Sequence, residues 1–329
     1  MQTFTEEQKM LRDSAERFVK EHYDFDARVK RAKGERADEL WSMMVELGWP
    51  MIPFTEADGG LGGGLAELVG VYEAFGRGLV LEPFFSSVTL GGGFVQRMSN
   101  DERRQAIVEG ITTGQRQVAA ALYEPRRRFD LMGTETVAET DGAGYRLRGQ
   151  KSLVLGGAQA NDLVVLARTS GAVGDAAGRT LFVVSADDPA IKRNGYRLRD
   201  DQPASDITFD GVQVDASAVV GDVDGATEVL DAVLSQARVC LSAEALGISA
   251  AVTEITKAYL GTRSQFGRPL GSFQVLGHRL TDMFVLTEEV RSLLYKTVAA
   301  EGTDALPALA RQLKLRANNA GLSVTKTSI

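Results

Sequence analysis

Cysteine and histidine are nearly absent from this sequence, which has one cysteine and two histidines in 329 residues. A single cysteine excludes an internal disulfide framework, and so few soft ligands argue against a zinc or iron site, so no metal is expected. A net charge of −7, from 37 basic and 44 acidic residues, disfavours nucleic acid as a partner. No continuous apolar run approaches the roughly 18 residues of a membrane span, and the N-terminus lacks the layout of a signal peptide. We therefore expect a cytoplasmic protein with no membrane span.

The residues that are present indicate a large globular protein in three parts. An apolar fraction of 44% is ordinary for such proteins. Residues 1–115 show helical periodicity, residues 116–225 contain short strand-like runs separated by turns, and residues 226–329 return to long helices. We predict an α+β multidomain fold with an N-terminal all-α domain, a central antiparallel β domain of six or more strands and a C-terminal helical bundle domain.

Local signals place several elements. Thr5 and Gln8 have the spacing of a capping box, and Asn100 is a candidate N-cap for the helix that follows it. Residues 226–260 are rich in Ala and Leu and contain no proline, which indicates a long helix packed in a bundle or at an oligomer interface. Cys240 lies in this stretch, and we expect a buried, inert thiol there because nothing nearby in the sequence would lower its pKa.

The segment with the most chemistry is the turn between two of the long helices, residues 263–274. It places Arg263, Gln265 and Phe266 beside glycine where one helix stops and the next begins. Guanidinium groups suit phosphate oxygens, and glycine lets a ligand approach the backbone. The same residues also fit a helix C-cap whose arginines complement the helix dipole. The residues alone leave both interpretations open.

This turn, preceded by Ala243-Glu-Ala-Leu-Gly247, resembles the signature of the acyl-CoA dehydrogenase family. Other motifs similar to those of the family follow the family's order along nearly the whole chain. They are the Pro53 to Gly62 turn, Tyr123-Glu-Pro125, Gly149-Gln-Lys151 and the strand from Phe209 to Val214. The resemblance implies an N-terminal helical domain, a central β domain and a C-terminal four-helix bundle.

The resemblance also implies an activity and a cofactor. It implies an FAD-dependent acyl-CoA dehydrogenase, which is a flavoprotein oxidoreductase that acts in the oxidation of fatty acids or steroid side chains. In such enzymes a Glu carboxylate removes the α proton of an acyl-CoA thioester and a hydride passes from the β carbon to the flavin, and a separate electron-transfer acceptor then reoxidises the flavin. The residues implied to reach the FAD of a neighbouring subunit are Arg263, Gln265, Phe266 and Gln274. The chain would then form a dimer or tetramer, with itself or with a similar chain.

Two positions implied to contact the flavin depart from the family pattern. After Tyr123, the family's small residues and hydroxyl are replaced by Arg126, Arg127, Arg128 and a phenylalanine. Leu155 stands near the end of a strand where the family carries Trp-Ile-Thr, so a ring and a hydroxyl donor are lost. The three arginines form either a solvated loop or a phosphate clamp for a CoA tail or a nucleotide.

The catalytic base is unassigned. Ala237 stands where some family members carry the Glu, and other members carry it in a C-terminal segment that would begin at about Ile329, so we expect the bundle domain to lack its last segment. Arg238 is the expected substrate-binding residue, through CoA, or it stabilises helix packing. Either the chain is an ordinary flavoenzyme whose last segment lies outside this sequence, or it is an FAD-poor, non-catalytic partner subunit of a heteromeric acyl-CoA dehydrogenase. In the second case it contributes the Arg263 turn to the partner's FAD. A non-enzymatic protein on the same fold is a third interpretation.

Overall fold

The computed structural model of the protein describes residues 5–329. Their internal contacts divide the chain into two compact units. The helical unit comprises the chain up to Lys33, Gly63–Val80 and Ser235–Ile329, and the sheet unit comprises Gly34–Gly62 and Leu81–Leu234. The predicted domain boundaries after residues 115 and 225 both fall inside the sheet unit, and the three-domain division stays a prediction.

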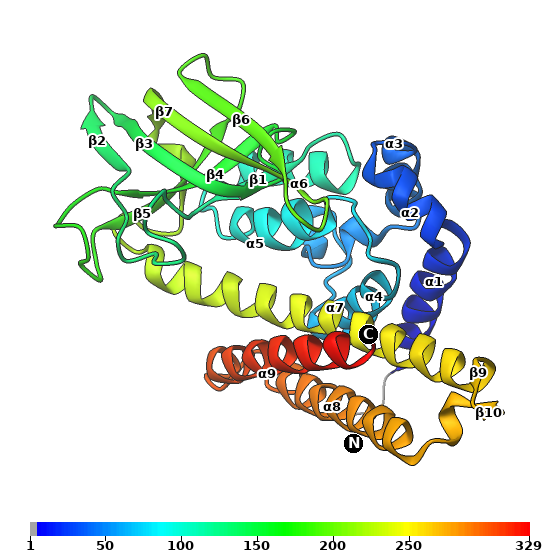
Figure 1. The fold of residues 1–329 in the computed structure, drawn as a ribbon. Coiled ribbons are helices and arrows are strands. Elements are labelled where there is room, and N and C mark those ends of the chain that lie inside the picture. The colour runs from blue at the N-terminus through cyan, green and yellow to red at the C-terminus, as the bar shows by residue number, and fades with distance from the viewer. Residues whose placement is uncertain (1–4) are drawn as a thin grey trace. The chain divides into compact units, whose positions relative to one another are not determined.

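Helices make up the helical unit (Figure 1). They are α1 (Glu6–His22), α2 (Phe25–Ala32), α4 (Leu65–Gly78), most of α7 (Ala226–Thr262), α8 (Gln274–Val298) and α9 (Leu306–Thr327). The predicted capping box is confirmed, because the Gln8 N–H donates to Thr5 Oγ1 and the Thr5 N–H donates to Gln8 Oε1, at 3.2 and 3.0 Å. The buried face of α1 packs against α4, where a Cβ on Gly78 would lie 2.6 Å from Val19.

The long helices predicted for residues 226–329 are confirmed as α7, α8 and α9. By length and composition alone, α7 is apolar enough to cross a membrane, and half of its most apolar stretch is buried within the protein. Core helices of helical bundles have the same length and composition, so this similarity is weak evidence for a span.

Glycines allow α4 and α7 to cross with their backbones in contact. A Cβ on Gly76 would lie 2.0 Å from the carbonyl oxygen of Glu244, and a Cβ on Gly247 would lie 2.0 Å from that of Glu73. Any larger residue would force the helices apart, so the crossing requires glycine at both positions. The Glu244 backbone therefore belongs to a packing contact.

The sheet unit contains one large sheet. Its strands are β1 (Val118–Ala121), β2 (Val137–Asp141), β3 (Gly144–Leu155), β4 (Asp162–Arg168), β5 (Arg179–Ser185), β6 (Ile191–Arg197), β7 (Pro203–Asp215) and β8 (Val219–Val220). They lie in the order β6-β7-β3-β2-β4-β5-β8, with β1 paired to β4. The sheet is mixed, because β1 runs parallel to β4 and a single parallel pair joins β2 to β4. The predicted β domain of six or more strands is confirmed, and its predicted antiparallel pairing holds except at these two places, where strands distant in sequence pair without a hairpin.

Short helices complete the sheet unit. They are α3 (Ala37–Glu46), η1 (Trp49–Met51), η2 (Glu56–Asp58), η3 (Phe84–Gly91), α5 (Gly92–Val95), α6 (Asp101–Thr112) and η4 (Ala216–Ala218). Asn100 caps α6 as predicted, since its Oδ1 accepts a hydrogen bond from the Arg103 N–H at 2.9 Å. The wide π-helix η3 packs on β1, where the Val118 N–H donates to Ser87 Oγ at 3.0 Å.

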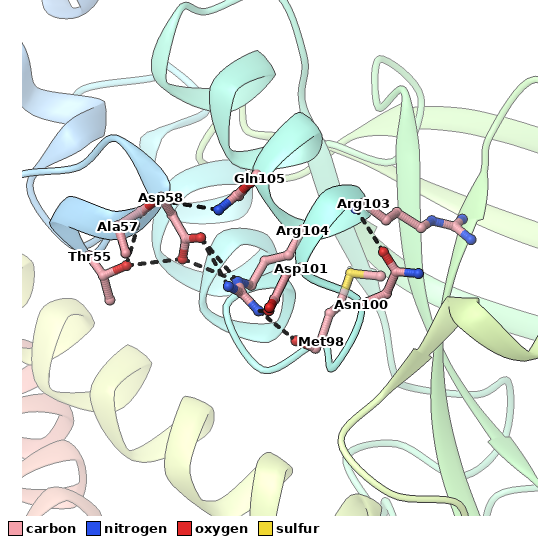
Figure 2. A network of polar contacts seen from close by, with 9 residues as sticks. All are labelled: Thr55, Ala57, Asp58, Met98, Asn100, Asp101, Arg103, Arg104 and Gln105. Carbon is pink, nitrogen blue, oxygen red and sulfur yellow. Dashed lines mark hydrogen bonds and ion pairs between the residues drawn. The ribbon is translucent and has the colours of Figure 1, made fainter.

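Figure 2 shows how the glycine-rich turn after Pro53 is fixed to α6. Arg104 donates from Nε to both carboxylate oxygens of Asp58 at 3.2 Å, and from Nη1 to the Met98 carbonyl at 3.0 Å. Thr55 Oγ1 contacts Asp58 Oδ2 at 3.0 Å. Because Asp58 is buried, this charge-assisted contact sets the position of the turn.

Candidate functional site

The turn singled out in the sequence forms a small hairpin at the end of α7. Its two short strands, β9 (Ser264–Gln265) and β10 (Arg268–Pro269), pair antiparallel. Phe266 and Gly267 both have positive φ, at 54° and 79°, which closes the tight turn between the strands. The Leu270 N–H donates to the Arg263 carbonyl at 2.8 Å and fixes the base of the hairpin. The helix η5 (Leu270–Ser272) then leads into α8.

Aromatic rings and guanidinium groups meet in this hairpin. The Arg268 guanidinium lies 4.0 Å from the centre of the Phe273 ring. Phe266 meets the same ring edge-on at 6.1 Å, and its own side chain is 89% exposed. Arg263 and Gln265 are also exposed. Exposed cations beside flat rings suit a ligand that carries both phosphate groups and a planar base.

The predicted turn residues Arg263, Gln265, Phe266 and Gln274 therefore lie within one hairpin and its junction with α8. Their predicted contact with FAD stays a prediction. The cation–ring pair of Arg268 and Phe273 adds to the cluster. Both residues belong to the turn singled out in the sequence, but their contact was not predicted. Its signal is the spacing of an arginine and a phenylalanine across a short loop.

Earlier on α7, Ala237 and Arg238 lie three and two residues before Cys240. The Ala237 side chain is 4% exposed and has no group that accepts a proton, so α7 supplies no base there. Arg238 is half-buried, and its predicted role in substrate binding stays a prediction. Cys240 is fully buried, which confirms the expected burial, and the inertness of its thiol stays a prediction. Burial, followed by the charges of Glu301 and Glu244, raises the pKa of this thiol far above its usual range.

The other two predicted flavin contacts, Tyr123 and Leu155, lie in the sheet unit. Tyr123 follows β1, and Leu155 is the last residue of β3; both are half-buried. The Ser152 N–H donates to the Tyr123 carbonyl at 2.9 Å, so the structure brings these two segments together. The ring of Phe129 meets Tyr123 edge-on, with centres 5.3 Å apart. The Leu155 side chain offers no hydrogen-bond donor.

A buried ion pair holds the Tyr123 segment to β3. Lys151 Nζ donates to Glu124 Oε1 at 2.7 Å and to the Leu122 carbonyl at 3.2 Å. Glu124 also accepts the N–H groups of Glu135 and Thr136, at 2.7 and 2.9 Å. Burial lowers the pKa of Lys151 to about 8, although the nearby Glu124 carboxylate opposes this. The pair thus connects the Tyr123-Glu-Pro and Gly-Gln-Lys motifs physically.

The strand β3 carries a bulge directly after Lys151. Its register with β7 shifts between Lys151 and Val154, and Leu153 has a positive φ of 55°. The Leu153 N–H contacts Tyr196 Oη at 3.2 Å and Asp206 Oδ1 at 3.3 Å, and the Tyr196 hydroxyl donates to Asp206 at 3.0 Å. Such backbone strain persists only where the surroundings hold it. The bulge therefore gives the end of β3 a fixed geometry.

One buried carboxyl group was missed in the sequence. Glu82 is 4% exposed and lies just before η3. Burial raises the pKa of this carboxyl to about 8, while nearby backbone groups partly lower it. Its signal in the sequence is a lone charge within the apolar run from Leu79 to Phe85.

Comparison with known proteins identifies the class. Sequence profiles of the acyl-CoA dehydrogenase family match the chain in order, with the N-terminal domain over residues 5–115, the middle domain over residues 119–212 and the C-terminal domain over residues 224–329. The chain therefore belongs to the acyl-CoA dehydrogenase family, whose members are FAD-dependent oxidoreductases.

Individual relatives agree with this class. Acyl-CoA dehydrogenase FadE27 of Mycobacterium tuberculosis is 30% identical over 268 residues, which are 82% of this chain and 68% of that protein. A chain of the ChsE4-ChsE5 complex from M. tuberculosis matches with a TM-score of 0.90 at 27% identity, over 100% of this chain and 87% of that one. A chain of a steroid ACAD, Tcur3481-Tcur3483, matches with a TM-score of 0.86 at 28% identity, over 98% of this chain and 86% of that one.

Proposed function

We propose that this chain is one subunit of a heteromeric acyl-CoA dehydrogenase that desaturates an acyl-CoA thioester between its α and β carbons. In this role the hairpin at Arg263 holds the phosphate and adenine end of an FAD bound to the neighbouring subunit. Because Ala237 offers no base, the carboxylate that removes the α proton comes from another residue. The observation that carries the proposal is an exposed cation–aromatic hairpin directly after α7, the helix that has an alanine at the base position.

The chemistry of the hairpin fits the dinucleotide end of FAD. Arg263 and Arg268 supply guanidinium donors for the two phosphates, and Phe266 presents an open ring to a planar base. All three lie within six residues, so one ligand spans them. A ligand seated on an exposed hairpin needs a second surface to enclose it, which supports an oligomer.

The chemistry of the sheet unit fits the flavin ring poorly. Leu153 and Leu155 offer no side-chain donors to the polar edge of a flavin, and Phe129 occupies one side of Tyr123. A buried polar edge without donors costs about 1–3 kcal/mol for each group. FAD supplies the hydride acceptor when it is bound. The residues of this chain suit the adenine end of FAD better than they suit the flavin ring.

Two-chain relatives support the heteromeric form. One similar structure is that of the ChsE4-ChsE5 complex, and another is named for the pair Tcur3481-Tcur3483. An enzyme active on its own is the second candidate, and the match of all three family profiles in order favours it.

Flavin content separates the two candidates. The chain is purified alone and after co-expression with an acyl-CoA dehydrogenase encoded beside it, and flavin absorbance per chain is recorded. We expect little flavin alone and stable flavin in the co-purified assembly, together with dehydrogenase activity towards an acyl-CoA. One FAD per chain and activity from this chain alone would reject the heteromeric proposal in favour of the second candidate.

A further inference from the structure

The loop after Glu124 has an unusual conformation for a run of arginines. Arg126 and Arg128 both adopt the left-handed region, with φ of 69° and 53°. The Arg127 N–H donates to the Glu124 carbonyl at 3.2 Å, and the Asp130 N–H donates to the Arg127 carbonyl at 3.1 Å. Two successive tight turns therefore form this loop. Non-glycine residues adopt this region only at a cost, so the surroundings hold the loop in shape.

The three arginines of the loop have different environments. Arg127 is half-buried and pairs with Glu135. Arg126 and Arg128 are exposed, and within residues 5–329 neither guanidinium has a hydrogen-bond or ion-pair partner. The carboxylate of Asp130 is engaged by the Met132 N–H, which donates to it at 2.9 Å. Two unpaired cations thus lie on either side of one paired arginine.

The loop rests on a fixed base. Glu124, which starts it, is buried and bound to Lys151, and it accepts the N–H groups of the two residues that follow the loop, Glu135 and Thr136. One carboxylate therefore joins the start and the end of the loop. Groups held in place before a ligand arrives lose less entropy when they bind it.

An aromatic ring lies next to the cations. Phe129 follows Arg128 directly and is 70% exposed, which is unusual for a phenylalanine in a soluble domain. Its contact with Tyr123 is edge-on, which braces the Phe129 ring while most of it stays open to solvent. A braced, exposed ring is a platform on which a planar base can stack.

The spacing brings both cations within reach of one ligand. The Cα atoms of Arg126 and Arg128 lie two residues apart, at most about 7.6 Å, and each side chain is long and flexible. Guanidinium groups favour phosphate oxygens, and a flat ring favours a nucleobase. The combination therefore selects a ligand that carries both.

We propose that Arg126, Arg128 and Phe129 form a binding site for the adenylate end of a nucleotide-bearing ligand, with the phosphates at the two arginines and the base on the ring. Two ligands of the reaction carry an adenosine with a diphosphate: acyl-CoA, which has a further 3′-phosphate, and FAD. The choice of these ligands rests on the proposed function, whereas the site itself does not. An acidic surface of a protein partner is the competing occupant.

Titration calorimetry with the full chain tests the site. The probes are CoA, 3′-dephospho-CoA, ADP and FAD, and the variants are Arg126→Gln/Arg128→Gln, Phe129→Leu and the matched control Arg127→Gln. We expect the double variant to weaken binding by at least about tenfold, and Phe129→Leu to weaken it less. Arg127→Gln leaves binding nearly unchanged, because that arginine is already paired with Glu135.

The probes distinguish the two sources of the adenylate. Tighter binding of CoA than of 3′-dephospho-CoA assigns the site to acyl-CoA, and the double variant then raises the KM of the assembly with its kcat and flavin content unchanged. Tighter binding of FAD with a loss of flavin assigns the site to FAD. If no probe binds, or if the double variant binds all four as the wild type does, the proposal is overturned. The flavin content of the wild-type assembly tests the proposed function separately.

Discussion

Lys151 and Glu124 form an ion pair of 2.7 Å in which the lysine side chain has no exposed surface. Both residues belong to motifs that resemble those of the family, and the pair fixes the loop before β2 to the middle of β3. We predict that Lys151→Met destabilises the protein by about 3–5 kcal/mol, because it leaves a buried carboxylate without its cation. Urea denaturation measures the loss. The double variant Glu124→Gln/Lys151→Met should recover a large part of it, and a loss below about 1 kcal/mol in the single variant would contradict this account.

The crossing of α4 and α7 predicts two costly substitutions. Gly76→Ala and Gly247→Ala each place a methyl group where a carbonyl oxygen lies 2.0 Å away, so each should lower the free energy of unfolding by about 1–3 kcal/mol. Gly277→Ala in α8 is the matched control, since nothing lies within 4 Å of its Cβ position. It should stabilise the helix by up to about 1 kcal/mol. Equal effects at the three positions in thermal denaturation would refute the close crossing.

The raised pKa of the buried Glu82 carboxyl leads us to expect that the free energy of unfolding depends on pH. Its pKa in the folded state is about 8, above the ordinary value of 4.5, so between these values the folded state binds more protons than the unfolded state. Its contribution to stability is therefore complete below about pH 4.5 and is lost as the pH rises towards 8. Glu82→Gln should be close to wild type at pH 5 and more stable than wild type at pH 8, by on the order of 3 kcal/mol.

Denaturant midpoints at the two pH values measure this difference. Glu46→Gln, at an exposed position of α3, serves as the control and should change stability little at either pH. A Glu82→Gln variant whose stability relative to wild type is the same at pH 5 and pH 8 would show that the carboxyl does not titrate in this range.

Cys240 should resist thiol reagents in the folded protein. Its thiol is fully buried and its pKa is raised, so both access and thiolate formation are suppressed. With Ellman's reagent at pH 8 we expect almost no reaction in buffer and one thiol per chain after unfolding in guanidinium chloride. Rapid reaction of the native chain would mean that α7 opens readily near its middle.

Arg263→Ala should weaken the retention of FAD in the assembly. The exposed guanidinium has no partner within the described residues, so its loss removes ligand contacts and leaves the fold intact. We expect roughly tenfold weaker binding, measured as flavin released on dilution, at an unchanged melting temperature of the chain. Arg17→Ala, at an exposed position of α1, should retain flavin as the wild type does. Unchanged flavin content in the Arg263→Ala variant would show that the hairpin is not part of the FAD site.

The sequence predicted those features whose interacting residues lie within a few positions of one another along the chain. The capping box of Thr5 and Gln8 and the cap at Asn100 depend on neighbours along the chain, so the sequence contains them in full. The strand β6 has no clear local signal, because six of its seven residues are exposed and an edge strand of this kind shows no alternation of apolar and polar residues. The parallel pairing of β1 with β4 depends on register across a long connection, which no local pattern encodes.

The residues of the candidate site likewise fall into those that are close in sequence and those that only folding brings together. The hairpin at Arg263 is continuous in sequence, so its residues could be singled out together. The partner of Lys151 lies 27 residues away, and only the pairing of the folded strands brings it close. The burial of Glu82 likewise depends on packing around η3. A lone charge in an apolar run does not encode that packing.

The exposed strand β6 forms one border of the large sheet, and at the opposite border β8 is only two residues long. The exposed residues of β6 include Lys192, Arg193 and Arg197. Two molecules that met border to border would bring these like charges together, while β8 is too short to template a strand. Polymerisation into fibres through the sheet is thus disfavoured.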